Sequence, residues 1–298
     1  MDTGRVGIVV VTYNRLKLLK EVIDSLRAQT YQNHRIVVVN NGSTDGTAEW
    51  LDEQTDLKII TQENLGGAGG FFTGMKYVAE NDFDYCWVMD DDVICKANAL
   101  EELISAYHAK EGVGYVCSKV EGIDGSPMNT PAVDVRPTAN GYPYYCELID
   151  RQMIKVVAST FVSVLLSTNT IRELGLPIKE FFIWGDDTEY TQRVSARYEC
   201  YMACKSVVVH KRAIQGGLNF LTETDPKRLK NFFYSFRNIG YIELKSSTAK
   251  HKTKWTIRRT RDALRLMLRG DFKRAKIILK AMIALMNFHP QICFPARL

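Results

Sequence analysis

Three consecutive aspartates, Asp90, Asp91 and Asp92, directly follow the apolar run CWVM of residues 86–89. Adjacent like charges repel one another, so three aspartates that directly follow a predicted strand require a partner of opposite charge. Carboxylates are ligands that Mg²⁺ and Mn²⁺ prefer, and these ions commonly keep positions open for phosphate oxygens. Because alternate residues of an extended chain point the same way, we expect Asp90 and Asp92 to share one face and Asp91 to point elsewhere. The alternative is an exposed acidic turn that caps the next helix.

A second acid pair, Asp186 and Asp187, lies in the motif WGDDTEY, directly after Trp184 and Gly185. Transfer of a sugar with inversion needs one general base for the acceptor hydroxyl, and a bound metal can stabilise the departing diphosphate. Either aspartate is also an ordinary helix N-cap, and Trp184 is suited to stack on a sugar or to fill a core. His210 ends the run VVVHKR and is a candidate third metal ligand or a structural histidine.

Two further polar clusters supply donors and acceptors that suit a base and a ribose, namely TYN at residues 12–14 and NNGSTD at residues 40–45. Asp45 either accepts hydrogen bonds from a nucleotide or caps the following helix. The stretch NLGGAGGF permits close approach of a ligand to the backbone at Gly66 and Gly67. It lacks the Gly-Lys-Ser/Thr ending of a P-loop and does not follow the first strand, so a dinucleotide fold is not expected.

Strand and helix patterns alternate through about the first 120 residues, which favours a parallel sheet with crossover helices. Ligands bind beyond the carboxyl ends of such strands, so the polar clusters that follow the strands should converge. The predicted strands lie within residues 6–14, 34–47, 57–64, 84–92 and 113–120. The predicted helices lie within residues 15–30, 48–54 and 99–110, and a glycine loop leads into another helix within residues 66–81.

The second part of the chain is more irregular. Four prolines and several glycines predict a loop-rich connection over residues 121–150. Residues 155–168 are predicted to form one strand, and residues 171–198 a helix, a loop and a second helix that begins at the acid pair. Residues 200–212 are predicted to form the last strand, which ends at His210.

The C-terminal region is strongly basic. Thirteen lysines and arginines lie between Lys245 and Lys280, and only Asp262 and Asp271 oppose them. Apolar residues between them predict amphipathic helices broken near Gly270, a pattern typical of binding to an anionic membrane surface. A basic face packed on the rest of the protein, or a homo-oligomer interface, is the alternative. No recognised nucleic-acid module accompanies the basic stretch, so a nucleic-acid partner is not expected.

The composition of the chain is ordinary for a soluble globular protein. The 298 residues are 46% hydrophobic and 24% charged, with a net charge of +5, and they suffice for one large domain with an appendage. No secretory signal opens the chain, and no window reaches the roughly 18 unbroken apolar residues of a spanning helix. Seven scattered cysteines predict reduced thiols. We therefore expect a cytoplasmic protein, peripheral at the inner face of the membrane.

The motifs VVTYNR, VVVNNGSTDGT, ENLGGAGGF, WVMDDD, WGDDTEY and VVVH occur in an order that resembles the inverting glycosyltransferases of family 2. The resemblance covers roughly residues 5 to 215 and implies the GT-A fold, a Rossmann-like, mostly parallel sheet flanked by helices. A catalytic domain would span residues 1–222, with a nucleotide-binding half to about residue 120 and an acceptor-binding half after it. The basic helical region would be residues 223–298. Within the family the chain looks most like the galactofuranosyltransferases, which would transfer galactofuranose from UDP-galactofuranose to a cell-surface glycan or a lipid-linked glycan.

The resemblance also implies a role for each matching residue. Asp90, Asp92 and His210 would bind Mn²⁺ or Mg²⁺, Asp187 would be the catalytic base, and Trp184 and Asp186 would line the acceptor pocket. The nucleotide-sugar would be held by nine residues: Thr12, Asn14, Arg15, Asn41, Asp45, Asn64, Gly66, Gly67 and Asp91. Many members carry aspartate where this chain has Asn40 or Asn41, which leaves uridine and thymidine both open.

Three other functions compete with this interpretation. Related rhamnosyltransferases share parts of the pattern, so dTDP-rhamnose, or a UDP-hexopyranose, is an alternative donor. A non-catalytic nucleotide-sugar-binding scaffold at the membrane would be expected to have lost some of Asp90, Asp92, Asp187 and His210, which are all present. A nucleotidyltransferase also uses metal-binding carboxylates, but an early Gly-rich loop bearing Arg or Lys is absent from this sequence.

Overall fold

The computed structural model describes residues 4–212, 218–245 and 247–296. The strands among these residues are β1 (Val6–Thr12), β2 (His34–Asn40), β3 (Lys58–Thr61), β4 (Tyr85–Asp90), β5 (Val93–Cys95), β6 (Val113–Glu121), β7 (Ala132–Val133), β8 (Met153–Ala158), β9 (Val164–Ser167) and β10 (Glu199–His210). The α-helices are α1 (Leu16–Arg27), α2 (Thr47–Asp52), α3 (Gly66–Ala79), α4 (Ala99–Tyr107), α5 (Thr168–Leu174), α6 (Asp186–Ser195), α7 (Pro226–Lys245), α8 (Ala249–Leu268) and α9 (Phe272–Met286). Two 3-10 helices are η1 (Ile149–Arg151) and η2 (Lys179–Phe181).

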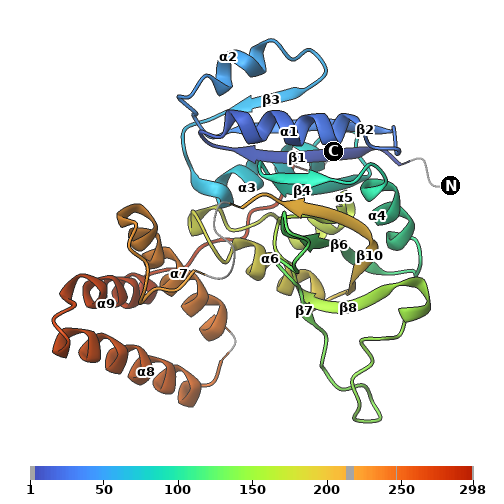
Figure 1. Ribbon diagram of the computed structural model, residues 1–298. Coiled ribbons are helices and arrows are strands. Elements are labelled where there is room, and N and C mark those ends of the chain that lie inside the picture. The colour runs from blue at the N-terminus through green and yellow to red at the C-terminus, as the bar shows by residue number, and fades with distance from the viewer. Residues whose placement is uncertain (1–3, 213–217, 246, 297–298) are drawn as a thin grey trace.

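A ten-stranded sheet forms the centre of the molecule, with helices on both faces and three further helices to one side (Figure 1). Its order is β3-β2-β1-β4-β9-β6-β10-β8-β7, and β5 pairs with β10. The strands β1 to β4 are mutually parallel, as are β6 and β10, whereas β9 runs antiparallel to both β4 and β6. The predicted α/β class, with a mostly parallel sheet and a C-terminal helical extension, is confirmed.

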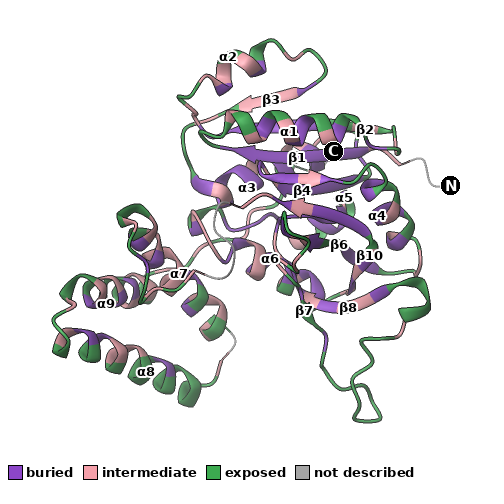
Figure 2. Ribbon diagram, in the orientation of Figure 1, coloured by how far each residue is buried: buried purple, intermediate pink, exposed green. Residues whose placement is uncertain are grey.

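Alternate residues of β1 face two separate cores. Ile8 and Val10 belong to a cluster that includes Leu19 of α1 and side chains of α4. Val9 belongs to a second cluster, with Met75 of α3 and side chains of α5 and α6. A strand that is buried on both faces has apolar residues at nearly every position. The sequence of β1 therefore shows no alternation of apolar and polar residues. The buried centre is the purple band of Figure 2.

The strands of the first half end together at one edge of the sheet. Thr12 at the end of β1 is level with Asn40 at the end of β2, which in turn is level with Thr61 of β3. On the other side of β1, Val11 pairs with Asp90 at the end of β4. The polar clusters that follow these strands therefore meet in space, as their positions in the sequence predicted.

The prediction of one strand over residues 155–168 is wrong, because two strands occupy this stretch. β8 lies toward one edge of the sheet beside β10, while β9 inserts between β4 and β6. The chain leaves the sheet between them at Ser159, whose backbone N–H donates to Thr191 Oγ1 of α6 at 3.0 Å. The Thr191 hydroxyl is also 3.1 Å from the carbonyl oxygen of Ser159. This pairing with a helix replaces the pairing with a neighbouring strand.

The predicted glycine loop at residues 66–71 is also wrong, because these glycines form the first turns of α3. They allow the helix to lie close to the sheet: a Cβ at Gly70 would be 2.3 Å from Val11 Cγ1, and one at Gly74 would be 2.3 Å from Val9 Cγ1. Gly66 has a φ of 72° and packs against the backbone of Phe182. The close approach that glycine permits is thus largely to the protein itself.

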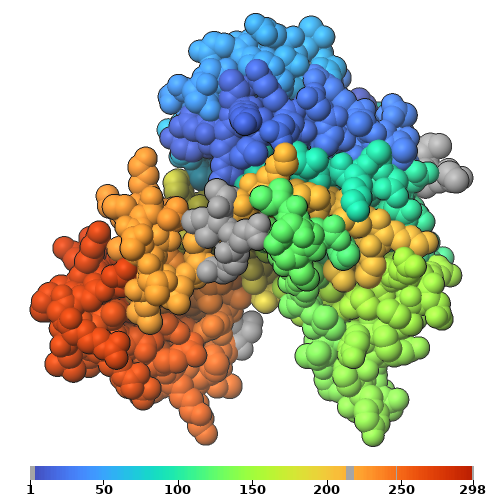
Figure 3. Space-filling view, viewed as in Figure 1, coloured from blue at the N-terminus to red at the C-terminus, as the bar shows by residue number. Residues whose placement is uncertain are grey.

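The C-terminal helices form a module beside the sheet, in which α9 packs against both α7 and α8. As predicted, basic helices are separated at Gly270, whose φ is 77°. After α9 the chain returns to the sheet domain, where Leu176 N–H donates to the carbonyl of Cys293 at 2.8 Å. None of the described helices is long and apolar enough to cross a membrane. Figure 3 shows a notch between this module and the connection over residues 121–150, which is loop-rich as predicted.

Replacing Gly74 with alanine should lower the free energy of unfolding by about 1–3 kcal/mol, because the new methyl group overlaps Val9. Gly67 of the same helix is the matched control, since a methyl group there meets no atom within 4 Å. Gly67→Ala should leave the protein unchanged or stabilise it by up to about 1 kcal/mol. Urea unfolding of both variants measures the difference. Equal losses would show that close packing on β1 is not the reason for glycine at residue 74.

Candidate active site

The structure brings Asp90, Asp92 and His210 together. One ligand atom from each lies within 4.8 Å of the others, although β4 and the end of β10 are more than a hundred residues apart in sequence. His210 Nε2 is 3.1 Å from Asp92 Oδ1. The side chains of Asp92 and His210 are both buried, while Asp90 is half-buried. Two carboxylates and an imidazole converging on one point form a candidate ligand set for a divalent cation.

The hydrogen bonds of this cluster fit a cation. Asn129 Oδ1 lies 2.9 Å from His210 Nδ1, so in the neutral ring Nδ1 carries the proton and Nε2 presents its lone pair toward Asp92. Asp92 Oδ1 is buried and has no hydrogen-bond partner among the described residues. Two lone pairs that face each other in a buried site are stabilised by a positive charge between them. The residues present therefore fit the Mn²⁺ or Mg²⁺ that the sequence predicts.

Arg15 and Thr12 hold the other carboxylate oxygens. Arg15 Nη1 is 2.6 Å from Asp92 Oδ2 and 3.2 Å from Asp91 Oδ1, and the Thr12 hydroxyl donates to Asp91 Oδ2 at 2.7 Å. Asp91 thus points back toward the end of β1 and away from the Asp90–Asp92–His210 cluster. The alternation expected for residues 90–92 is what the structure shows.

The charges of the site compete with one another. Burial and the neighbouring charges of Asp92 and Asp91 raise the pKa of Asp90 well above its ordinary value, and Asp186 adds to this effect. Burial raises the pKa of Asp91 to about 6, against the opposing influence of Arg15 and Thr12. Burial acts in the same direction on Asp92, but the hydrogen bond and positive charge that a protonated His210 ring would supply, together with Arg15, prevail and lower its pKa. Asp92 is therefore the aspartate of the three that most strongly favours the charged form.

Several residues predicted to hold a nucleotide are engaged with the protein. Asp45 accepts from the backbone N–H of Leu16 at the start of α1 and from the Thr47 hydroxyl. It is not the N-cap of the following helix, because Gly46 occupies that position in α2. Asn14, with a φ of 53°, accepts from the backbone N–H of Thr44 at 2.7 Å. These contacts join the loops after β1 and β2 into one surface.

Asn41 and Asn64 are similarly engaged. The Asn41 amide donates to the carbonyl of Gly66 at 3.0 Å and accepts from Gln62 at 2.7 Å, and the residue is only 2% exposed. Asn64 accepts from the backbone N–H of Gly66. Both side chains fix the entry to α3, and their expected contact with a nucleotide stays a prediction. Asn40 differs, since its Nδ2 is buried without a hydrogen-bond partner among the described residues.

The acid pair opens α6, as predicted, with Gly185 before it in the left-handed region at a φ of 92°. Asp187 Oδ1 accepts from the backbone N–H and the hydroxyl of Thr188. Burial and the adjacent charge of Asp187 raise the pKa of Asp186 to about 8, and burial raises the pKa of Asp187. Strongly shifted carboxylic acids beside a candidate metal site are what acid–base chemistry requires. The charge of Asp186 also contributes to the raised pKa of Asp90.

The segment before the acid pair is strained and is held by α7. Phe182 and Trp184 have φ values of 65° and 64°, which bulky side chains rarely adopt. Asn238, fully buried on α7, donates to the carbonyls of Phe181, Ile183 and Trp184 at 2.9, 3.1 and 2.7 Å. The Trp184 ring lies half-buried, 5.2 Å from the ring of Phe232 on the same helix.

Sequence reasoning missed Asn129 and Asn238. Asn129 lies in the proline-rich connection, where no periodicity or motif marks it. Asn238 gave no usable signal, because it lies nine positions after Leu229 and therefore on the opposite side of α7 from that buried residue. The backbone before the acid pair is therefore held by the C-terminal helices, a role that their basic composition did not suggest.

Comparison with known proteins agrees with this geometry. A family profile described as glycosyl transferase family 2 matches residues 7–161, just over half of the chain. The chain is 27% identical over 264 residues to the galactofuranosyltransferase GlfT1 of Mycobacterium tuberculosis, and the match covers 80% of this chain and 82% of that protein.

Solved structures share the fold at low sequence identity. The structure of S. aureus TarS in complex with UDP matches with a TM-score of 0.57 and 14% identity, over 84% of this chain and 69% of that one. The mannosyltransferase PcManGT of Pyrobaculum calidifontis, in complex with GDP-Man and Mn²⁺, matches with a TM-score of 0.53 and 16% identity, over 95% and 87% of the two chains. These likenesses show the GT-A fold.

Asn238→Leu should lower the free energy of unfolding by about 2–3 kcal/mol, because three carbonyls lose a buried donor. Hydrogen exchange should also accelerate over residues 182–187 specifically. Asn231→Leu is the control, since Asn231 lies half-buried on the same helix and makes none of these three bonds. A uniform loss of protection across α7 would instead indicate a general packing role for Asn238.

Asp186→Asn should stabilise the protein near pH 8 and have little effect below about pH 4. The folded carboxyl has a pKa of about 8, far above the value near 3.9 of an unfolded chain, so the folded state binds the proton more tightly. The wild-type protein therefore loses stability as the pH rises through this interval, whereas the variant does not. Melting temperatures measured in EDTA across the interval test this. Asp150→Asn removes an exposed carboxylate and controls for net charge. A constant difference between Asp186→Asn and wild type would contradict the assignment.

Proposed function

The chain belongs to glycosyl transferase family 2, and we propose that it is a metal-dependent, inverting galactofuranosyltransferase that uses UDP-galactofuranose. The single observation that carries the metal-dependent part is the convergence of Asp90, Asp92 and His210 beside the acid pair. The likeness to GlfT1 over 80% of the chain supports the choice of sugar. We propose that the acceptor is a growing cell-surface glycan, carried on a lipid at the cytoplasmic face of the membrane.

Asp90, Asp92 and His210 would hold the divalent cation, and the complex of PcManGT with Mn²⁺ supports this for the fold. When bound, such an ion supplies positive charge that stabilises the departing diphosphate. Arg15 fixes one oxygen of Asp92, so that the other oxygen and the His210 ring face the same point. Asn129 keeps the ring in the tautomer that a ligand must have.

Asp187 takes the proton from the acceptor hydroxyl as the acceptor oxygen forms its bond to the anomeric carbon. The bond from that carbon to the diphosphate oxygen breaks in the same displacement, and UDP departs. Thr188 fixes one oxygen of the carboxylate through two hydrogen bonds. The raised pKa of Asp187 brings its basicity closer to what a general base needs near neutral pH. Trp184 provides a ring against which a sugar can lie.

The donor is tested by hydrolysis with purified protein, Mn²⁺ and a panel of UDP-galactofuranose, UDP-galactopyranose, UDP-glucose, UDP-N-acetylglucosamine and dTDP-rhamnose. We expect slow release of UDP from UDP-galactofuranose and from no other donor of the panel. This release should be lost when Mn²⁺ is chelated, and also in the Asp92→Ala variant. Preference for dTDP-rhamnose would overturn the sugar and keep the mechanism. If no donor is cleaved, calorimetric titration with UDP separates an enzyme idle without its acceptor from a wrong donor class.

The two aspartates of the pair are a matched test of the base. Asp187→Asn should lower kcat by about 10²–10⁴-fold while UDP still binds, because only the proton acceptor is lost. Asp186→Asn should raise KM for the acceptor more than it lowers kcat, since Asp186 is assigned to the acceptor pocket. The reverse pattern in the two variants would move the base to Asp186, whose charge acts on Asp90.

A further inference from the structure

Helix α8 carries two apolar stripes on opposite faces. Trp255, Ala263 and Leu266 are buried in the C-terminal module. Ile257, Leu264 and Leu268 follow one another at spacings of seven and four residues, so they share a second face. These three side chains are 61%, 53% and 88% exposed. An amphipathic helix packed on a protein needs one apolar face, and the second therefore requires its own explanation.

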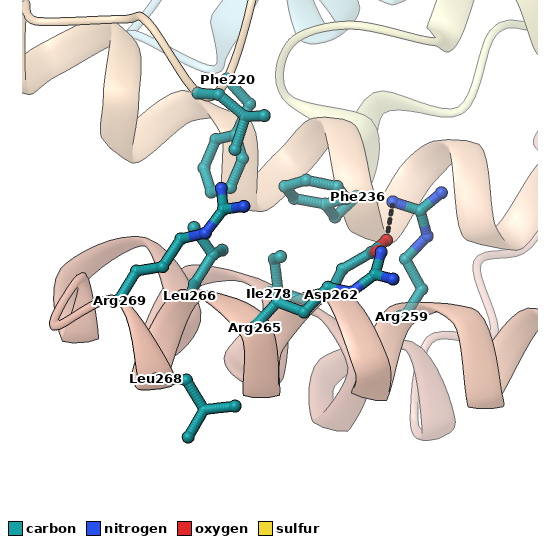
Figure 4. Close-up of a pocket in the computed structure, with 10 residues that line it drawn as sticks. Phe220, Phe236, Arg259, Asp262, Arg265, Leu266, Leu268, Arg269 and Ile278 are labelled. Carbon is teal, nitrogen blue, oxygen red and sulfur yellow. Dashed lines mark ion pairs between the residues drawn. The ribbon is translucent and has the colours of Figure 1, made fainter.

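No described part of the chain covers this second stripe. In Figure 1 α8 is the outermost helix of the module, and in Figure 2 much of its length is exposed. Figure 4 shows Leu268 directed away from the neighbouring helices. Phe272, just beyond the end of α8, extends the apolar surface and is 67% exposed.

Arginines accompany the exposed stripe. Arg261 lies between Ile257 and Leu264 on the same face, and Arg258, Arg265 and Arg269 follow along one side of it. The side chains of Arg259, Arg265 and Arg269 also line a cavity of about 780 Å³, shown in Figure 4. The apolar lining of that cavity comes from Phe220, Leu221, Phe236, Leu266, Leu268 and Ile278. Cations next to exposed and cavity-lining apolar groups suit a partner that is both anionic and apolar.

We propose that the outer face of α8 docks on an anionic phospholipid bilayer. Ile257, Leu264 and Leu268 enter the boundary between headgroups and acyl chains, and the arginines contact lipid phosphates. The cavity beside α8 receives part of a lipid at the edge of this contact. The inference does not depend on the proposed sugar or reaction, because none of these residues belongs to the active site.

Charge favours a bilayer over a second copy of the chain. A symmetric contact between two α8 helices would bring the same surface together twice, and with it Arg258, Arg261, Arg265 and Arg269 of each copy. Asp262 of this helix pairs with Arg259 at 3.3 Å, and Glu243 of α7 lies 3.6 Å from Arg258, so Arg261, Arg265 and Arg269 carry most of the net positive charge. Like charges across an interface are unfavourable, whereas anionic headgroups are complementary to this surface.

The test is co-sedimentation of the full chain with vesicles of phosphatidylcholine, with and without phosphatidylglycerol. We expect binding that requires phosphatidylglycerol and weakens as salt is added. The triple variant Ile257→Ser, Leu264→Ser, Leu268→Ser should reduce the partition coefficient by about tenfold or more. Ile123→Ser is the matched control, because Ile123 is 64% exposed and lies outside α8, and its binding should equal that of wild type.

A reporter measures depth of insertion. The fluorescence of Leu268→Trp should shift to shorter wavelength with anionic vesicles and be quenched by brominated acyl chains, whereas Ile123→Trp should show neither change. Melting temperature and donor hydrolysis of the triple variant should match wild type, which excludes misfolding as the cause of lost binding.

Three results would overturn the proposal. The first is equal vesicle binding by the triple variant and wild type. The second is a lipid-free dimer, seen by light scattering, that the triple variant converts to monomer while neither binds vesicles, since the stripe would then be covered by a second copy. The third is displacement from vesicles by inorganic phosphate alone at unchanged ionic strength, which would identify an anion site in the arginine-lined cavity. If none of the nucleotide-sugars is hydrolysed, vesicle binding, light scattering and displacement by phosphate can still be measured.

Discussion

Repulsion between carboxylates at the end of β4 is the constraint around which the molecule is organised. Asp90, Asp91 and Asp92 are consecutive, and Asp186 reaches the same region from another element. Arg15 is the cation that contacts two of them, and His210 faces one. Thr12 at the end of β1 holds Asp91 through a further hydrogen bond. An unfolded chain would separate these charges, so the fold bears a cost that a bound cation and a diphosphate would offset.

The other half of the site depends on a different interaction. The backbone before Asp186 adopts positive φ at Phe182, Trp184 and Gly185, and the three carbonyls held by Asn238 maintain that path. The helix that supplies Asn238 lies outside the region matched by the family profile, which ends at residue 161. The C-terminal helices therefore serve two purposes on opposite sides: α7 shapes the site, and α8 presents a cationic and apolar face to the surroundings.

Features with a local cause were predictable from the sequence. Apolar runs followed by polar clusters identified β1, β2 and β4 together with the residues at their ends, because parallel strands place those ends at one edge. Features that depend on distant partners were not predictable. The break between β8 and β9 follows from a bond between Ser159 and Thr191, and the glycines of α3 are explained by Val9 and Val11 of another element. The amides of Asn41 and Asn64 were expected to face a ligand, and only the folded chain shows that they bind Gly66 and Gln62.

Asn238 follows the strained segment before Asp186 at a considerable distance in the sequence, and this distance has a consequence for biosynthesis. Trp184 and Asn238 are separated by 54 positions. At roughly 5–20 residues per second, the ribosome therefore adds Asn238 about 3–11 s after Trp184. During that interval the sheet and the carboxylates of β4 can already assemble, while the backbone before the acid pair still lacks the hydrogen bonds from Asn238. A nascent chain would thus acquire its candidate metal site first and the fixed backbone path before the acid pair last.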